Sequence, residues 1–291
     1  MKFLYTSDLH GKKHLYQELL DVALVASSEI VILGGDLLPS HPSTKRYEDM
    51  LPSQKQFSRE FLSPFFRKIL TTTTVKRVFL IPGNWDSGFP YLLQDPVPGV
   101  VDLSQTLHRL ENGYELIGYP FVPPTPFRPK DFEKMDDLVS PWPPQKQPSY
   151  VRSPDRPDQL TAVDPYLYLR ERGTINEDLD SLPKARSFRR TILVMHSPPF
   201  GTRLDGVQGG RSAGSRSLKA FILENQPLLV LCGHIHEAPE LSGSYVDLLG
   251  ETICVNPGQF TSVSPNLHAV TFEIEKVAET LEHTYFSKIQ A

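Results

Sequence analysis

Ile30-Val31-Ile32-Leu33-Gly34-Gly35-Asp36 is an apolar run that ends in two glycines and a carboxylate. Four aliphatic residues in a row are typical of a strand that is buried on both faces of a sheet. Four other short apolar runs are followed in the same way by polar groups, at residues 8–10, 84–86, 196 and 234–236. Ligands bind at the carboxyl ends of strands in open α/β sheets, because the loops there converge around a crevice. Five such strand ends therefore predict one shared site.

The polar side chains at these strand ends are of the types that bind divalent metal ions in proteins. They comprise two carboxylates, one amide and four imidazoles: Asp8, Asp36, Asn84, His10, His196, His234 and His236. Side chains at positions i and i+2 of an extended segment share a face, so the pairs 8/10 and 234/236 can each present two donor atoms in one direction. Glycines at 34, 35, 83 and 233 allow the backbone to come close to a bound ion. Oxygen and nitrogen donors suit Mn²⁺, Fe²⁺ or Zn²⁺, whereas a structural zinc site favours cysteine thiolates.

Each motif also has a simpler interpretation. Asp-x-His and Gly-Gly-Asp alone are commonly turns, and His196 alone is commonly a hydrogen-bonded histidine of the core or of a cleft. Five motifs in one compatible order, each at a predicted strand end, favour the metal site.

The chain resembles the calcineurin-like metallophosphoesterases, whose motifs in order are D-x-H, G-D, G-N-H-D/E, H and G-H-x-H. The resemblance runs from Asp8 to about Gly258 and includes the turn Val255-Asn256-Pro257-Gly258 after the last histidine pair. Around residues 196–199 and 232–237 the chain looks most like a predicted bacterial and archaeal phosphoesterase branch related to cyclic-nucleotide phosphodiesterases. The resemblance implies an α/β fold, a four-layer αββα sandwich of two mixed β-sheets flanked by helices.

The resemblance also implies two divalent metal ions, with manganese favoured and iron or zinc as alternatives. One ion would be held by Asp8, His10, Asp36 and His236, and the other by Asp36, Asn84, His196 and His234. Asp36 then bridges the two ions, and Asp36, Asn84 and His196 are the expected catalytic residues. A metal-bridging hydroxide would attack the phosphorus in line.

Trp85 is the main departure from the family, which usually has histidine at this position of G-N-H-D. That histidine is thought to stabilise the phosphoryl oxygens or to protonate the leaving group, and general acid assistance is typically worth about 10²–10⁴-fold. We therefore expect phosphodiesters to be preferred over monoesters. Trp85 could stack on an aryl or nucleobase group, or pack beneath its loop. Asp86, which orients the histidine in the family, is expected to cap the turn before Ser87, and His14 and His41 are the nearest other proton donors.

A proline-rich segment at about 121–165 separates Asn84 from His196. Proline cannot donate to a strand ladder, so this segment should run over the surface as a lid or rim of the site, a structural wrap or an interface. We expect a single metallophosphoesterase domain over residues 1–291, with this segment as an insertion. Beyond His196, three arginines are candidates to bind a non-reacting phosphate oxygen or are solvated surface residues: Arg203, Arg211 and Arg216. Gly214 or Ser215 is expected to cap a helix whose first N–H groups favour anions.

Two early segments have helical spacing of apolar residues, 14–26 and 54–70. The second is expected to break near Pro64, and its phenylalanine stripe predicts core packing rather than a cofactor site.

Composition excludes several classes of protein. A chain of 291 residues with 39% apolar residues and net charge −4 is typical of a globular protein and gives no general electrostatic case for nucleic-acid binding. No signal-peptide core and no apolar stretch of membrane-spanning length is found, so we expect a cytoplasmic protein without a membrane partner. Cys232 and Cys254 lie in apolar runs and are expected to be buried free thiols. The oligomeric state stays open.

The sequence thus predicts a dinuclear metal-dependent phosphoric ester hydrolase, most simply a phosphodiesterase acting on a small phosphoester, for which a nucleotide-like compound is one candidate. One alternative is a metal-loaded interaction scaffold without activity, but members of that kind have lost ligands that this chain keeps. Another is a phosphomonoesterase or protein phosphatase of the same fold. Protein phosphatases have an arginine before G-N-H-E, where this chain has Ile81-Pro82.

Overall fold

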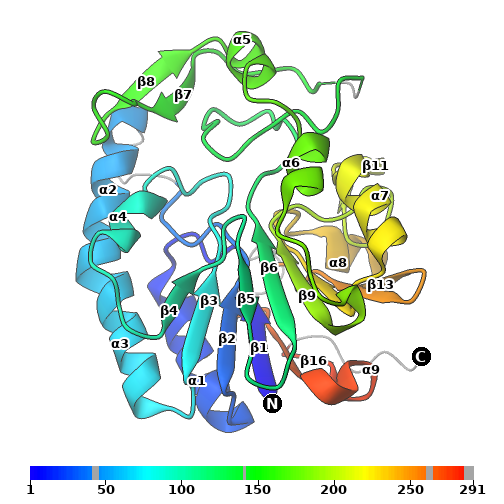
Figure 1. The fold of residues 1–291 in the computed structure, drawn as a ribbon. Coiled ribbons are helices and arrows are strands. Elements are labelled where there is room, and N and C mark those ends of the chain that lie inside the picture. The colour runs from blue at the N-terminus through cyan, green and yellow to red at the C-terminus, as the bar shows by residue number, and fades with distance from the viewer. Residues whose placement is uncertain (41–45, 140–141, 260–264, 285–291) are drawn as a thin grey trace.

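The computed structural model describes residues 1–40, 46–139, 142–259 and 265–284. In this part of the chain two six-stranded mixed sheets pack face to face, with helices on their outer faces (Figure 1). The four-layer αββα sandwich expected from the sequence is therefore confirmed.

The first sheet has four parallel strands in its interior and at one edge, extended at the other edge by two antiparallel strands. Its strands in spatial order are β16 (Glu282–His283), β15 (Val270–Glu273), β1 (Lys2–Thr6), β2 (Ile30–Leu33), β3 (Arg77–Leu80) and β4 (Val100–Asp102). Sequence neighbours β1, β2 and β3 lie side by side, so the loops that follow them leave the sheet at the same edge.

The second sheet has four parallel strands flanked by an antiparallel strand on each side. Its strands in spatial order are β13 (Val246–Leu249), β14 (Thr252–Val255), β12 (Leu229–Leu231), β9 (Thr191–Met195), β6 (Glu115–Tyr119) and β5 (Leu107–Arg109). Two short hairpins lie outside the sandwich, β7 (Ser149–Arg152) with β8 (Leu160–Val163), and β10 (Gly206–Val207) with β11 (Arg211–Ser212).

Side chains alternate between the two faces of each central strand, and the two faces belong to different apolar clusters. In β1, Phe3 and Tyr5 belong to the apolar cluster between the two sheets, whereas Leu4 belongs to the cluster beneath the helices. In β9, Ile192 and Val194 face the first sheet, and Leu193 faces the opposite helical layer. Because both faces of these strands are covered, apolar residues follow one another without interruption, as the sequence shows.

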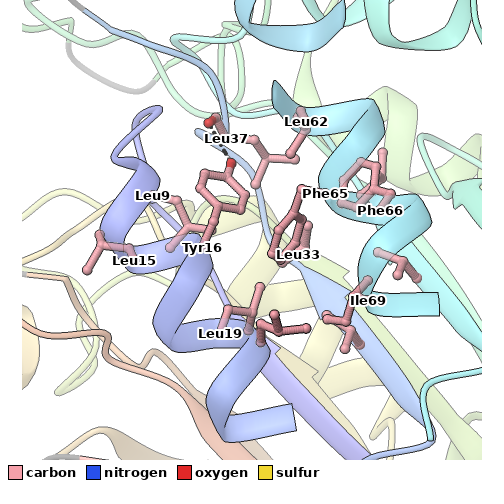
Figure 2. Close-up of a cluster of buried hydrophobic side chains, with 14 of the residues drawn as sticks. Leu9, Leu15, Tyr16, Leu19, Leu33, Leu37, Leu62, Phe65, Phe66 and Ile69 are labelled. Atoms are coloured by element: carbon pink, nitrogen blue, oxygen red, sulfur yellow. Dashed lines mark hydrogen bonds between the residues drawn. The ribbon is translucent and has the colours of Figure 1, made fainter. Parts of the chain in front are cut away.

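Helices α1 (Lys13–Ala26), α2 (Met50–Phe57) and α3 (Ser63–Thr72) cover the outer face of the first sheet. Figure 2 shows side chains of α1 and α3 meeting around Leu33 of β2. The hydroxyl of Tyr16, which is fully buried, donates a hydrogen bond to the backbone oxygen of Leu37, 2.7 Å away. Phe57 and Phe65 belong to this core, as the sequence predicted.

The predicted break near Pro64 is wrong. A π-helical turn over Ser58–Leu62 joins α2 to α3, and Pro64 lies in the first turn of α3. The chain is helical on both sides of Pro64, so its missing N–H group lies inside a continuous helix, just after a π turn of the kind found where the hydrogen-bond ladder of a helix is interrupted.

The second sheet is covered on its outer face by α6 (Ile175–Ser181) and α7 (Arg216–Asn225). The remaining α-helices of the described ranges are short: α4 (Phe89–Leu93), α5 (Pro165–Arg170), α8 (Ala238–Ser242) and α9 (Val277–Thr280). None of the helices in these ranges is long and apolar enough to cross a membrane. Cys232 and Cys254 are buried free thiols, as predicted.

The proline-rich segment carries β7 and β8 and lies in green at the top of Figure 1, beyond the sheets. It is held by a buried ion pair, in which Nζ of Lys130 lies 2.8 Å from Oε2 of Glu133 and neither side chain is exposed to solvent. The same Nζ donates to the backbone oxygen of Thr125. Burial raises the pKa of Glu133 to about 7, because a charged carboxylate is poorly solvated there. Such a pair stays buried because hydrogen bonds satisfy both charges.

Candidate metal centre

The seven predicted ligand side chains lie at the carboxyl ends of five strands, which meet at one edge of the sandwich. Asp8 follows β1, Asp36 follows β2, and Asn84 follows β3 in the first sheet. From the second sheet, His196 follows β9, and the pair 234/236 follows β12. Parallel pairing within each sheet brings these loops together.

Four of these side chains form a tight first group. One ligand atom from each of Asp8, His10, Asp36 and His236 lies within 4.8 Å of all the others. The Nε2 atoms of His10 and His236 are 3.1 Å apart, and Nε2 of His236 is 3.2 Å from Oδ1 of Asp8. Nε2 of His10 is 3.7 Å from Oδ2 of Asp36.

A second group lies on the other side of Asp36. Nε2 of His196 is 3.6 Å from Oδ2 of Asp36 and 3.3 Å from Oδ1 of Asn84. The ring of His234 is 5.3 Å from the ring of His196, centroid to centroid. The same carboxylate oxygen of Asp36 therefore faces both groups.

The donor chemistry fits divalent metal ions. Two imidazole nitrogens that face each other at 3.1 Å repel unless a proton or a cation lies between them. Nδ1 of His10 and Nδ2 of Asn84 are buried and have no hydrogen-bond partner within the described ranges. Mixed carboxylate, imidazole and amide donors suit borderline divalent ions.

The backbone of the site is strained. Asp8, His10, Asp36 and His234 have φ angles of 61°, 46°, 53° and 68°. Such left-handed conformations are uncommon for residues other than glycine and cost about 1–3 kcal/mol each. Backbone hydrogen bonds hold the strained loops together, from Asp8 N to Gly35 O (2.9 Å) and from His10 N to Asp36 O (2.8 Å).

Glycines in the motifs allow the close approach that the sequence predicted. A Cβ atom on Gly83 would lie 2.5 Å from Nε2 of His196 and would also overlap Asp36. A Cβ atom on Gly233 would lie 2.5 Å from Oδ2 of Asp8. Any side chain at these two positions would displace a ligand.

Burial and mutual charge shift the pKa values of the ligands in opposite directions. Burial lowers the pKa of His10 to about 4, and burial together with the charge of His196 lowers that of His234 to about 3. For His196 burial also acts downward, but the nearby carboxylate of Asp36 outweighs it and raises the pKa to about 9. Burial by itself would raise the pKa of Asp8, but the neighbouring imidazoles, His236 first, hold it below its usual range.

Asp86 ties two of the metal-binding loops together. Its carboxylate accepts hydrogen bonds from the backbone N–H groups of Leu37 (3.0 Å), Leu38 (2.8 Å) and Gly83 (2.9 Å). The bond from Gly83 is the turn cap that the sequence predicted, and the other two reach the loop after β2. Burial and the charge of Asp36 raise the pKa of Asp86 to about 7.

Gln54 of α2 has a supporting role that the sequence analysis missed. Its Nε2 donates to the backbone oxygens of Trp85 (2.7 Å) and Pro39 (2.9 Å), and its Oε1 accepts from Gly88 N (2.7 Å). The residue is fully buried. Nothing in the local sequence distinguishes Gln54 from the other polar residues of its helix.

Asn256, in the turn after β14, supports the loop of the last histidine pair. Its Nδ2 donates to the backbone oxygens of Leu204 and Ile235, each at 3.0 Å. The turn is the segment Val255-Asn256-Pro257-Gly258 that the sequence resemblance includes. The side-chain amide of Asn256 holds this turn against the metal-binding loop.

A cavity of about 1160 Å³ opens beside the metal ligands. Metal ligands, the proline-rich segment and the loops before α7 line it, including Asp36, His234, His236, Pro123–Phe127, Trp142–Lys146, Phe200, Arg211 and Arg216. Trp85 also lines it but is only 7% exposed, because its ring packs against Phe127 with centroids 5.3 Å apart. The backbone N–H of Trp85 donates to Oδ1 of Asp36 at 2.8 Å.

The three candidate arginines have different positions. Arg211 and Arg216 line the cavity, whereas Arg203 is not among its lining residues. The guanidinium of Arg216 lies over the ring of Phe200, with Cζ 3.5 Å from the centroid.

The N-terminus of α7 already carries a carboxylate. Ser215 caps the helix, as predicted, by accepting from Leu218 N at 3.0 Å. Asp136 accepts from Arg216 N at 2.6 Å and from the hydroxyl of Ser215 at 2.5 Å. Asp136 belongs to the proline-rich segment, so this segment supplies the negative charge that the N-terminus of the helix favours.

His14, one of the other proton-donor candidates, does not line the cavity. His14 is exposed, with Nε2 3.2 Å from the backbone oxygen of Pro265. His41 lies outside the described residues.

Comparison with known proteins gives a family match and matches of fold. The family model for calcineurin-like phosphoesterase matches residues 1–238. No curated protein matches the chain in sequence. Among solved structures, TT1561 of Thermus thermophilus has a TM-score of 0.54 at 17% identity, over 98% of this chain and 99% of its own. A dimetal phosphatase from Danio rerio has a TM-score of 0.50 at 10% identity, over 99% of each chain. Likeness at these identities is evidence for the fold alone.

Proposed function

This chain belongs to the calcineurin-like phosphoesterase family, and from that premise we propose that it is a dinuclear metal-dependent phosphodiesterase. One ion would be held by Asp8, His10, Asp36 and His236, and the other by Asp36, Asn84, His196 and His234. Manganese is favoured, with iron or zinc as alternatives, because the donors are oxygen and imidazole nitrogen without thiolates.

The observation that carries this proposal is the position of Asp36 between the two groups. Its Oδ2 is 3.7 Å from Nε2 of His10 and 3.6 Å from Nε2 of His196. Divalent ions bound there would polarise the phosphoryl oxygens and lower the pKa of a coordinated water.

Residues of the chain would position this chemistry. Nδ1 of His196 lies 2.7 Å from the backbone oxygen of Gly34, so its N–H donates there and Nε2 is left as the ligand atom. Oδ1 of Asp36 accepts from Trp85 N, which orients the carboxylate. The buried Nδ2 of Asn84, unpartnered within the described ranges, is free to donate to an ester oxygen.

Preference for diesters with good leaving groups would follow from Trp85. An indole N–H does not release its proton near neutral pH, so Trp85 cannot protonate a departing alkoxide as an imidazolium can. We also propose that residues 1–291 form one domain, with the segment 121–165 as an insertion over the cavity.

A screen of the purified protein tests the proposed function. The chelated protein is reloaded with Mn²⁺, Zn²⁺ or Fe²⁺ and assayed on an aryl diester, an aryl monoester, cyclic nucleotides and a phosphoprotein. We expect activity only with metal, and higher kcat/KM on the diester than on the monoester. Faster turnover of monoesters would contradict the diester preference. No turnover of any ester by a protein that holds two ions would favour the scaffold alternative.

A further inference from the structure

Trp142 forms a flat wall of the cavity that contains Asp36, His234 and His236. Its indole is stacked on Tyr166 of α5, with centroids 5.2 Å apart and ring planes 17° from parallel. Tyr166 thus covers one face of Trp142 and holds the ring in a fixed orientation. Trp142 remains only partly buried.

The segment after Trp142 is fastened to the same helix. The backbone N–H of Gln145 points to the hydroxyl of Tyr166 at 3.5 Å, and Nε2 of Gln145 donates to the backbone oxygen of Pro143 at 2.8 Å. The first contact joins the segment to α5, and the second lies within the segment and fixes its own turn. Trp142 and the residues after it are thus connected to α5 through Tyr166.

The other apolar groups in the cavity are mostly rigid and flat. From the insertion they are Pro123, Pro124, Pro126, Phe127, Pro143 and Pro144. Rings with few rotatable bonds lose little entropy when a flat group packs on them. Flexible aliphatic chains, which would suit an alkyl group, are represented mainly by Val207 and Ile235.

The size of the cavity indicates a ligand that extends beyond the phosphoryl group. The cavity volume of about 1160 Å³ exceeds the roughly 300–1,000 Å³ of ordinary small-molecule sites. Lys146, Arg211 and Arg216 line it as well, beside the carboxylates of Asp136, Asp137 and Glu237, so the cavity offers cationic groups to a phosphate without being positively charged throughout. A compact ester such as glycerol phosphate would leave most of this wall uncovered.

We infer that Trp142 and the prolines beside it bind a planar aromatic substituent of the ester, a nucleobase or an aryl ring, while its phosphoryl group faces the metal ligands. The assignment of the phosphoryl end rests on the proposed function, whereas the stacking contact itself needs no metal. Base–aromatic stacking tolerates any planar ring, since every such ring has a π face.

Tryptophan fluorescence tests this inference directly. The chain has two tryptophans, so the Trp85→Phe variant leaves Trp142 as the single indole reporter. This variant is titrated with adenosine monophosphate, phenyl phosphate, hexyl phosphate and glycerol phosphate, both with Mn²⁺ and after chelation. We expect saturable quenching by the two aromatic phosphates, and the stronger of the two distinguishes a nucleobase subsite from an aryl subsite. Equal responses to hexyl phosphate would mean that the wall is merely apolar and would overturn the planar assignment.

Calorimetry on the otherwise natural chain provides the matched variants. Trp142→Leu should weaken binding of the preferred aromatic phosphate by about tenfold, whereas Trp142→Phe, which keeps a flat face, should weaken it much less. Leu167→Ala is the control, because Leu167 is 64% exposed on the same helix and does not line the cavity. Unchanged affinity in a folded Trp142→Leu protein would reject the subsite.

The two proposals fail separately. Aromatic quenching without hydrolysis of any ester would reject the proposed function and leave the stacking subsite standing. Metal-dependent hydrolysis with the same KM and the same binding affinity for esters with and without an aromatic ring would support the proposed function and reject the stacking subsite.

Discussion

Asp36 shows how much depends on one side chain in this site. Its φ angle of 53° is left-handed, its Oδ1 accepts from Trp85 N, and its Oδ2 faces His10 on one side and His196 on the other. In this position the negative charge of Asp36 would offset the positive charge of an ion in either ligand group. Removing it is therefore expected to have a larger effect than removing a ligand of one group.

We predict that Asp36→Ala loses both metal ions, because the bridging carboxylate belongs to both groups. The matched variant Asp8→Ala removes a ligand from the first group alone and should retain about one ion per chain. Elemental analysis after Mn²⁺ loading and gel filtration measures both. Two tightly held ions in the Asp36→Ala protein would show that the bridge assignment is wrong.

Trp85→His should flatten the dependence of kcat/KM on leaving-group pKa and raise turnover of alkyl monoesters, by about tenfold or more if the imidazole acts as an acid. Asp86 already accepts three backbone hydrogen bonds, so it would orient the new ring less well than a free carboxylate. Trp85→Phe, which adds no proton donor, is the control. A natural protein that is already fast on alkyl monoesters would refute the argument and imply another donor.

Metal affinity should rise with pH. Without metal, burial acts to lower the pKa of His196, but the charge of Asp36 dominates and raises it from 6.5 to about 9. A metal ion must displace this proton, so affinity should increase by up to about tenfold per pH unit until about pH 9. Competition titrations with Mn²⁺ at several pH values measure this slope, and an affinity that is flat from pH 6 to 9 would contradict it.

The stability of the chelated protein should fall as the pH rises, whereas the metal affinity rises. A raised pKa in the folded state stabilises the fold fully below the unfolded value of 6.5, and this contribution is lost as the pH rises through about 9. Thermal unfolding of the chelated protein across that range provides the check.

At the scale of elements, the insertion is joined to the second sheet through the N-terminus of α7. Asp136 accepts from the first N–H of that helix and from the hydroxyl of its capping residue, Ser215. Ser215 N in turn donates to Pro198 O, two residues beyond His196. The insertion, the helix and a metal-binding loop therefore share one set of hydrogen bonds.

Asp136→Ala should lower the free energy of unfolding by about 1–3 kcal/mol, because it removes charge-assisted hydrogen bonds and leaves the N–H of Arg216 without its acceptor. It should also raise KM while two ions remain bound, since the insertion lines the cavity and supplies no metal ligand. Glu224→Ala, an exposed carboxylate on the same helix, should change neither quantity. An unchanged KM in the Asp136→Ala protein would mean that the insertion does not select substrates.

At the scale of the whole molecule, the metal site connects the two sheets. Its ligands come from three strands of one sheet and two of the other, and His236 Nε2 lies 3.2 Å from Asp8 Oδ1 across that junction. An ion bound there would link both halves of the sandwich, and its absence would leave strained loops and clustered carboxylates.

Chelation is therefore expected to lower Tm. A ligand that binds the folded state alone contributes about 4 kcal/mol at a free concentration 1,000 times its Kd, and Tm changes by about 2–4 °C per kcal/mol in a chain of roughly this size. Differential scanning calorimetry with and without Mn²⁺ should show a decrease of roughly 10 °C or more. A Tm that does not respond to metal would contradict a structural contribution of the site.

Strand ends and candidate ligands could be predicted from the amino-acid sequence, because both depend on local patterns. Continuous apolar runs predict strands that are covered on both faces, and a polar residue after each run places a ligand at the end of that strand. The αββα sandwich itself was implied by the family resemblance of the motifs, whereas these rules identified the side chains that meet at its edge. They failed at Pro64, where a π turn replaced the predicted break.

The groups that support the ligands and the closure of the cavity depend on contacts between residues that are distant in the sequence. Asp136 and Ser215 are 79 residues apart, and Gln54 and Trp85 are 31 apart, with no periodic pattern linking either pair. The stacking of Trp142 on Tyr166 likewise depends on where α5 docks. Such contacts form because the folded chain brings unpaired donors, acceptors and rings together, and a single sequence does not record that proximity.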